Sequence, residues 1–132
     1  MSQENVEVIR RGFEAWNAGD MEGVREIYDP EAVMRYHGDF PEPGPFVGRD
    51  AIMRQFERLR DALDERDSLV FVGDFLDAGD RVVNRFAWRG EGYGPAMDLE
   101  LTVVYTVRGG RILEAEFFRD HDQALEAAGL SE

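Results

Sequence analysis

The second half of the chain alternates apolar and polar side chains with a period of two, and this pattern constrains the fold more than any other. It predicts four successive β-strands, which we place at about residues 68–76, 81–89, 97–107 and 111–119. The segments Asp77-Ala78-Gly79-Asp80 and Arg108-Gly109-Gly110-Arg111 are typical of tight hairpin turns, and Gly90 to Pro95 predicts a looser connection. The pattern therefore predicts an antiparallel meander.

The turns also predict which residues of neighbouring strands face each other. A two-residue turn at Gly109-Gly110 would place Val103 opposite Glu116. A turn at Ala78-Gly79, together with a loose turn near Tyr93, would give the next two hairpins a register with the same inner face. That predicted inner face carries Leu69, Phe71, Phe75, Val82, Phe86, Trp88, Leu99, Leu101, Val103, Ile112 and Phe118.

The opposite face of the predicted meander is only partly polar. Its apolar members by the same register are Val72, Val83, Val104, Leu113, Ala115 and Phe117. An apolar patch of this kind is unusual on a monomer surface, and pairing two sheets would bury it. We therefore expect a homodimer that associates through this outer face.

The first half of the chain is predicted to be mainly helical. Apolar residues recur at helical spacing over 4–17 and 49–65, and a capping signal at Asp20 predicts a second helix over 21–28 that Pro30 ends. A short strand is predicted at 32–37, followed by a Pro-rich loop or lid.

These elements predict an α+β architecture in one domain, 1–132. Three amphipathic helices are the available cover for the inner face of the sheet. A twisted, mostly antiparallel sheet that curves around them gives a conical barrel with a hollow interior. The sequence Asp120-His121-Asp122-Gln123 predicts the start of a short C-terminal helix.

Composition excludes several classes of function. The formal net charge is −13, so binding to nucleic acid or to an anionic membrane surface is disfavoured. The absence of cysteine excludes disulfides and thiolate metal sites. The N-terminal residues lack the apolar run of a signal peptide, and no stretch is long and apolar enough to span a membrane. We expect a cytoplasmic protein.

Two carboxylates are candidates for catalysis. Glu116 is predicted to lie on the inner face among apolar side chains, where desolvation would favour proton transfer near neutral pH. The alternative is that an arginine from a helix pairs with Glu116, or that water reaches it. Asp120 would also face inward at the end of the last strand, although its position also fits the N-cap of the following helix, and we favour the N-cap.

The remaining candidates would form a binding pocket. Large aromatic residues on the inward stripes would shape it, and three polar residues would contact the ligand; the first group is Trp16, Tyr36, Phe86 and Trp88, and the second is Asn84, His37 and Tyr105. His37 and His121 are isolated imidazoles, so no metal site is predicted. No phosphate-binding or dinucleotide-binding motif is present, and no cofactor is predicted.

Several segments of this sequence are similar to those of a known superfamily. They are Phe13-Glu14-Ala15-Trp16-Asn17-Ala18-Gly19-Asp20, Tyr28-Asp29-Pro30-Glu31-Ala32-Val33, Gly48-Arg49-Asp50-Ala51-Ile52, Asp77-Ala78-Gly79-Asp80 and Gln123-Ala124-Leu125-Glu126-Ala127-Ala128-Gly129-Leu130. With the predicted order of elements, the chain resembles the SnoaL-like branch of the nuclear-transport-factor-2-like superfamily. The resemblance implies a cystatin-like conical barrel, a cavity between helices and sheet, and frequent dimers.

The activities of this superfamily include polyketide cyclases, ketosteroid isomerases, dehydratases and epoxide hydrolases. The base of the isomerases would fall near Tyr36, and their oxyanion-hole aspartate near Thr102 or Val103, so the sequence departs from that mechanism. The cyclases place an acidic residue near the end of the last strand, which Glu116 or Asp120 could match. We expect either a cofactor-free isomerase, cyclase or dehydratase acting on an apolar oxygenated substrate, or a non-catalytic binding or dimerisation module.

Overall fold

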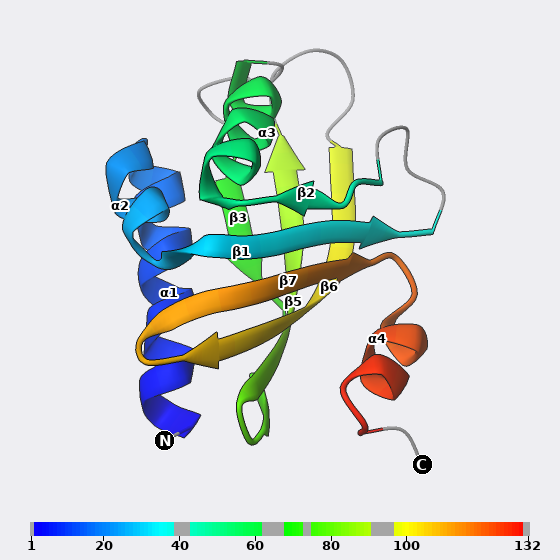
Figure 1. The fold of residues 1–132 in the computed structure, drawn as a ribbon. Helices are drawn as coiled ribbons and strands as arrows, with labels where there is room; N and C mark the ends of the chain where they lie inside the picture. Colours follow the sequence, from blue (N-terminus) through cyan, green and yellow to red (C-terminus); the bar gives the residue numbers. More distant parts are fainter. Residues whose placement is uncertain (1, 39–42, 62–67, 73–74, 91–96, 131–132) are drawn as a thin grey trace.

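Over the residues that it describes, the computed structural model shows four helices and a curved mixed sheet (Figure 1). It describes residues 2–38, 43–61, 68–72, 75–90 and 97–130. The helices are α1 (Ser2–Ala18), α2 (Met21–Glu26), α3 (Arg49–Asp61) and α4 (His121–Ala127). The strands are β1 (Tyr28–His37), β2 (Phe46–Val47), β3 (Ser68–Phe71), β4 (Leu76–Ala78), β5 (Arg81–Gly90), β6 (Met97–Arg108) and β7 (Arg111–Phe118).

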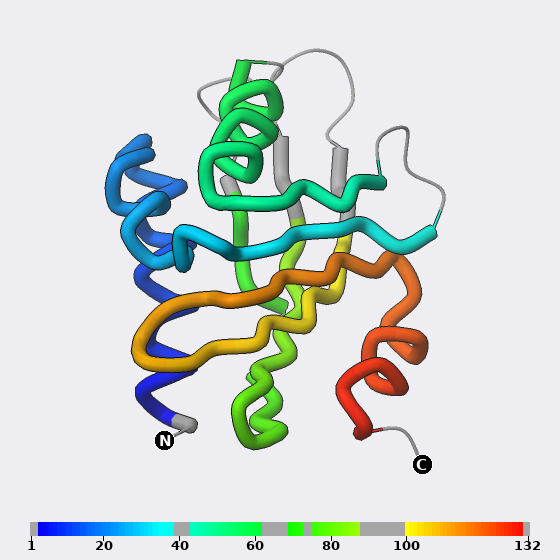
Figure 2. The backbone as a smooth tube through the Cα atoms, in the orientation of Figure 1, coloured from blue at the N-terminus to red at the C-terminus, as the bar shows by residue number. Residues whose placement is uncertain are grey.

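The strands follow the order β2-β1-β7-β6-β5-β3, and β4 pairs with β5 beside this path. All of the pairs are antiparallel except β1 with β7, which run parallel. The tube in Figure 2 shows how β1 and β7, far apart in sequence, lie side by side across the middle of the molecule. The predicted α+β class and the short C-terminal helix are confirmed.

The apolar stripe of α1 packs onto the concave face of the sheet. Ile9, Phe13 and Trp16 are buried there together with residues of α2 and α3. Gly19 follows α1 with a φ of 75°, a backbone conformation that favours glycine. The side chain of Asp20 then caps α2 by accepting a hydrogen bond from the backbone N–H of Gly23.

The second helix and the first strand differ from the prediction. The helix ends at Glu26, and a ten-residue strand begins at Tyr28, so Pro30 lies inside β1. The pairing of β1 with β7 is irregular between Tyr28 and Val33. Proline lacks a backbone N–H, and such an irregular stretch tolerates it because no ladder hydrogen bond is lost there.

Of the three predicted hairpin registers, the one between β5 and β6 is correct throughout, and the one between the predicted strand over 68–76 and β5 is correct in part. The register of β5 with β6, including Trp88 with Leu99 and Asn84 with Val103, is confirmed. The register of β3 with β5, with Phe71 opposite Phe86, is confirmed too. The predicted strand over 68–76 is, however, divided into β3 and β4, and Asp77 rather than Phe75 faces Val82.

The predicted register of β6 with β7 holds next to the hairpin turn and is wrong from Thr106 onward. Val107 pairs with Ile112, but Thr106 pairs with Glu114, so one residue, Leu113, is inserted into β7 as a bulge. Because successive side chains of a strand point to opposite faces, the extra residue reverses the orientation of everything after it. Ala115 and Phe117 consequently join the inner cluster, whereas Phe118 lies on the outer side.

Two apolar clusters hold the sheet from its two faces. The larger one lies between the concave face and helices α1, α2 and α3. The smaller one lies under α4 and contains Val83, Val104 and Phe118. Figure 1 shows α4 set apart from the other helices. In the described part of the chain, no helix has the length and apolar character needed to cross a bilayer.

Candidate functional site

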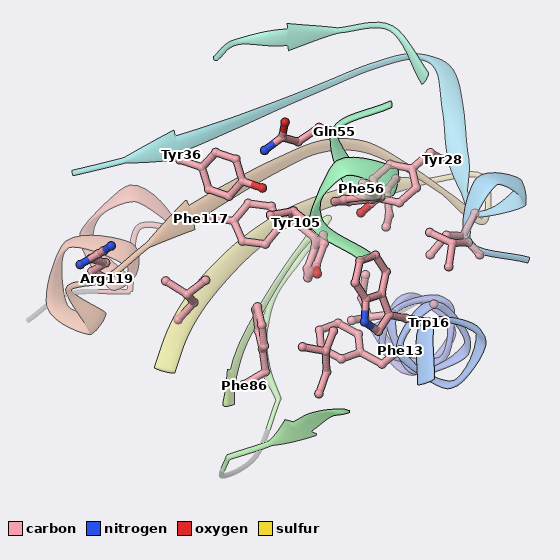
Figure 3. Close-up of a pocket in the computed structure, with 18 residues that line it drawn as sticks. Phe13, Trp16, Tyr28, Tyr36, Gln55, Phe56, Phe86, Tyr105, Phe117 and Arg119 are labelled. Atoms are coloured by element: carbon pink, nitrogen blue, oxygen red, sulfur yellow. The ribbon is translucent and has the colours of Figure 1, made fainter. Parts of the chain in front are cut away.

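A cavity of about 360 Å³ lies between the concave face of the sheet and the helices that cover it (Figure 3). Phe13 and Trp16 of α1 and Phe56 of α3 line one end, and Phe86 and Phe117 line the sheet side. Residues of this kind form the apolar lining because each lies on the inward stripe of its own helix or strand. Such a space suits a small apolar molecule.

Three tyrosines supply hydroxyl groups to this lining. Tyr28 and Tyr36 come from the two ends of β1, and Tyr105 comes from β6. Figure 3 shows the rings of Tyr28 and Tyr36 projecting from opposite ends toward the middle of the cavity. Burial raises the pKa of each phenol, most strongly for Tyr28 and Tyr105. At neutral pH the three hydroxyls are therefore uncharged and can donate hydrogen bonds.

Gln55 of α3 adds an amide to the same region. Its Oε1 accepts a hydrogen bond of 2.8 Å from Nη2 of Arg58, which orients the amide. A hydrogen bond between Gln55 and Tyr36 acts on the pKa of Tyr36 in the direction opposite to burial. Gln55 thus links the α3 surface to the hydroxyl of Tyr36.

The two ends of the cavity differ in the residues that line them. Arg119, directly after β7, is the one formally charged residue among the described residues that line it. At the other end, the guanidinium of Arg60 lies 4.9 Å from the ring centroid of Trp16 and donates a 2.8 Å hydrogen bond to the Trp16 carbonyl. Figure 3 shows Arg119 far from Trp16, so a guanidinium lines one end of the cavity and an aromatic ring, with Arg60 packed on it, lines the other.

Four of the residues predicted to form the pocket line the cavity: Trp16, Tyr36, Phe86 and Tyr105. The side chain of Trp88 lies outside the described part of the structure. Residues 41–42 of the predicted Pro-rich loop or lid, which spans 41–45, also lie outside it. The structure therefore places four of the predicted residues around the cavity.

The prediction that Glu116 faces the cavity is wrong. The bulge at Leu113 places Glu116 opposite Val104, on the outer side of the sheet. There its Oε1 lies 2.8 Å from Nε2 of His37, and the His37 ring stacks on Phe118 with centroids 4.4 Å apart. His37 is not a cavity residue either, because its side chain lies with Glu116 on the outer side of the sheet.

The prediction of a catalytic Asp120 is not supported by its position. Its carboxylate accepts hydrogen bonds from the backbone N–H groups of Asp122 and Gln123, which is the geometry of a helix N-cap. His121, one residue later, has Nδ1 at 2.9 Å from the Thr102 hydroxyl. The structure therefore places both residues in the attachment of α4 rather than in the cavity lining.

Asn84 lies on the inner face of β5, as predicted, but it does not line the cavity. Its side chain is 97% buried, since only 3% of the residue surface is exposed, and neither Oδ1 nor Nδ2 has a hydrogen-bond partner among the described atoms. Burying such a group without a partner costs about 1–3 kcal/mol.

The sequence prediction missed Tyr28, Gln55 and Arg119. Tyr28 was assigned to a helix, so its inward position could not be deduced. Gln55 had a signal, because it lies next to Phe56 on the apolar stripe that begins at Ile52. Arg119 lies inward only because of the bulge in β7, and no sequence pattern predicted that bulge.

The model of a family described as a SnoaL-like domain matches residues 9–115 of this chain. An uncharacterized protein of Mycobacterium tuberculosis is 23% identical over 117 residues, covering 88% of this chain and 89% of the relative. The solved structure of Bal32a, from a soil-derived mobile gene cassette, is 28% identical with a TM-score of 0.77 and 88% coverage of both chains. A candidate SnoaL-like polyketide cyclase from Jannaschia sp. CCS1 has 21% identity and a TM-score of 0.74, covering 99% of this chain and 94% of its own.

Proposed function

The chain belongs to the SnoaL-like domain family, and from that premise we propose that its cavity binds an apolar small molecule that carries oxygen atoms. The observation that carries this proposal is the set of three uncharged tyrosine hydroxyls in a lining that is apolar except for them, Gln55 and Arg119. Hydroxyl donors of this kind suit carbonyl, phenol or enol oxygens. The likeness to a candidate polyketide cyclase supports the same ligand class.

The proposal is tested with two probes that differ in one hydroxyl group, naphthalene and 2-naphthol. Isothermal titration calorimetry of the unmodified protein should show tighter binding of 2-naphthol. Replacing Tyr36 by phenylalanine should weaken 2-naphthol binding roughly 2- to 10-fold and leave naphthalene binding unchanged, because one hydrogen bond is lost. Thr102→Val is the matched control, since Thr102 is buried on the outer face.

Equal affinity for both probes, or binding that is insensitive to Tyr36→Phe, would contradict the proposal. Failure of either probe to bind would also do so. The Phe86→Trp substitution fills the cavity and should reduce binding of the probes. If binding is not reduced, the probes bind at a second site.

A second candidate is a cofactor-free isomerisation, cyclisation or dehydration of the bound molecule. Neutral donors in an apolar space stabilise an oxyanion as it forms, which is the observation in favour of this candidate. Among the described residues that line the cavity, none carries a carboxylate or an imidazole. We therefore assign the oxyanion-stabilising role to Tyr36 and Tyr105, and no proton-transfer role to Glu116. With an identified substrate, Tyr36→Phe should lower kcat more than Glu116→Gln does.

Association into a homodimer through the outer sheet face stays a prediction, and the surface it would use is revised. Val83 and Val104 lie under α4, and Ala115 and Phe117 face inward. Val47, which pairs with Val33 at the β1–β2 edge, is 67% exposed. Light scattering coupled to size-exclusion chromatography should show a dimer that Val47→Glu weakens; a monomer at all concentrations would contradict the prediction.

Location in the cytoplasm likewise stays a prediction.

A further inference from the structure

We propose that the molecule bound in the cavity carries a carboxylate at one end, and that the guanidinium of Arg119 binds this carboxylate. The inference rests on the proposed function, because it needs an apolar, oxygen-bearing ligand in the same space. It adds the charge of the ligand and its orientation, with the apolar part inside and the acid at the mouth.

The fold places Arg119 at the mouth of the cavity. Arg119 comes directly after β7 and lies two residues beyond Phe117, so it continues the inner face of that strand. It lines the cavity, and it is at the same time exposed to solvent. A residue with both properties lies where the cavity opens to water.

The cavity continues inward from Arg119 along two aromatic rings. Phe117 pairs with Tyr36 of β1, and the centroids of their rings are 4.9 Å apart. Figure 3 shows Arg119 on one side of these rings, with Tyr28 and Trp16 on the far side. A molecule that extends from the mouth to the far end therefore lies beside the rings of Tyr36 and Phe117.

The polar groups of the lining change in kind from the interior to the mouth. Tyr28 and Tyr105 are 5% and 3% exposed, and burial raises the pKa of both phenols, so their hydroxyls stay uncharged. Such hydroxyls suit an uncharged oxygen. Arg119 is always charged and is exposed, so it suits an anion that keeps part of its hydration.

The charge of the whole chain makes a cation at this position important for an acidic ligand. With a net charge of −13, the chain repels anions at long range. Arg119 also interacts within the chain, and its five N–H donors leave room for a ligand beside that interaction. A guanidinium matches both oxygens of a carboxylate, and such charge-assisted hydrogen bonds are about twice as strong as neutral ones. The contact therefore offsets the long-range repulsion.

The test compares 2-naphthoate with 2-naphthamide, which has nearly the same shape and no charge, by calorimetry at neutral pH. The unmodified protein should bind 2-naphthoate about tenfold more tightly, because hydrogen bonds to charged groups are the stronger ones. Arg119→Gln should bring this affinity ratio close to one. Arg119→Lys keeps the charge without the planar fork, so it should keep part of the ratio. The affinity for 2-naphthamide should stay the same in both variants.

Arg111→Gln is the matched control for the loss of one positive charge. Arg111 begins the same strand, is exposed and does not line the cavity, so the affinity ratio should equal that of the unmodified protein. Far-UV circular dichroism verifies that each variant is folded, since Arg119 directly precedes the N-cap of α4.

A second measurement needs no variant. The probe 6-hydroxy-2-naphthoate carries its hydroxyl and its carboxylate at opposite ends, whereas 4-hydroxy-2-naphthoate carries both on one ring. With the acid at the mouth and the tyrosine hydroxyls further inside, the 6-hydroxy isomer should bind several-fold more tightly. Equal affinity of the two isomers would overturn the proposed orientation.

The inference as a whole is overturned if the unmodified protein binds 2-naphthoate no more tightly than 2-naphthamide. It is also overturned if Arg119→Gln leaves the ratio unchanged, or if Arg111→Gln lowers it equally. When 2-naphthol still binds and responds to Tyr36→Phe, these results remove only this inference. If no probe binds, the proposed function fails and this inference fails with it.

Discussion

At the scale of single residues, Glu116 pairs with His37 outside the cavity, although its neighbour in sequence, Phe117, lines the cavity. The two side chains are 27% and 37% exposed, and they join the ends of β1 and β7 on the outer face. A pair of side chains with this exposure contributes about 0–1 kcal/mol to stability. Its role is to hold two strands together at their ends.

We expect Glu116→Gln to leave probe binding unchanged and to reduce the free energy of unfolding by less than about 1 kcal/mol. The reason is that the side chain contacts His37 and not the cavity. Calorimetry with 2-naphthol and urea unfolding measure the two effects. A tenfold loss of affinity in Glu116→Gln, with Tyr36→Phe unaffected, would refute this placement of the carboxylate.

The buried tyrosines predict a specific alkaline behaviour. Their pKa values are raised in the folded state above the ordinary value of about 10, so the folded chain keeps protons that the unfolded chain loses. Their contribution to stability is complete below about pH 10 and is lost as the pH rises toward the folded pKa values.

Absorbance at 295 nm should therefore show that Tyr28, Tyr36 and Tyr105 ionise only as the protein unfolds. Far-UV circular dichroism at each pH reports whether the fold is intact, and the urea-unfolded chain should titrate near pH 10 as a reference. Ionisation of all tyrosines near pH 10 in a native protein would show that these side chains are not buried.

At the scale of elements, the bulge in β7 decides which residues reach the cavity. Alternation along β5 and β6 predicted the inner face correctly, because both strands are regular over their paired lengths. In β7 the pattern gave no warning, since Leu113, Ala115 and Phe117 are apolar and alternate with Glu114 and Glu116 in either register. Where both faces of a strand accept apolar residues, the hydrophobic pattern cannot select the register.

The attachment of α4 can be tested through its N-cap. Asp120→Ala should reduce the free energy of unfolding by about 1 kcal/mol, because two backbone N–H groups lose their acceptor. Asp120→Asn, which can still accept, should retain most of that stability. Urea titration measures both variants, and equal loss in the two would show that the cap is not what Asp120 contributes.

Asp120→Ala should also leave 2-naphthol affinity unchanged while α4 remains docked on Val83 and Phe118. Loss of affinity in Asp120→Ala at full stability would restore Asp120 as a candidate catalytic or binding residue.

At the scale of the whole molecule, the sequence predicted the family and the fold class, and it named four of the residues that the structure places around the cavity. These depend on patterns that extend over many residues, which one irregularity does not erase. The polar residues of the site depend on single positions. Tyr28 was lost through one misplaced helix boundary, and Arg119 through one inserted residue.

The excess of negative charge predicts stabilisation by salt. With a net charge of −13, repulsion among carboxylates opposes the compact state, and added ions screen it. Exposed pairs such as Arg25–Asp50 and Arg85–Glu100 weaken in salt, but each contributes little. We expect the Tm to rise by about 2–5 °C when NaCl increases from about 20 to 200 mM at pH 7.

The control for this effect is the same experiment near the sequence pI of about 4.5, where the net charge is small and the rise should shrink. A lower Tm in 200 mM NaCl at pH 7 would mean that local ion pairs outweigh the overall repulsion.

The parallel pairing of β1 with β7 also has a consequence for folding. The contact between His37 and Glu116 joins positions separated by 79 in the sequence. Closing so long a loop costs entropy before any contact compensates for it, so folding should be limited by this late step rather than by the local hairpins. On the ribosome, the early helices and β1 emerge well before β7 is synthesised, and until then their apolar surfaces stay exposed. During that interval the nascent chain exposes apolar surface that only its own last strand can cover.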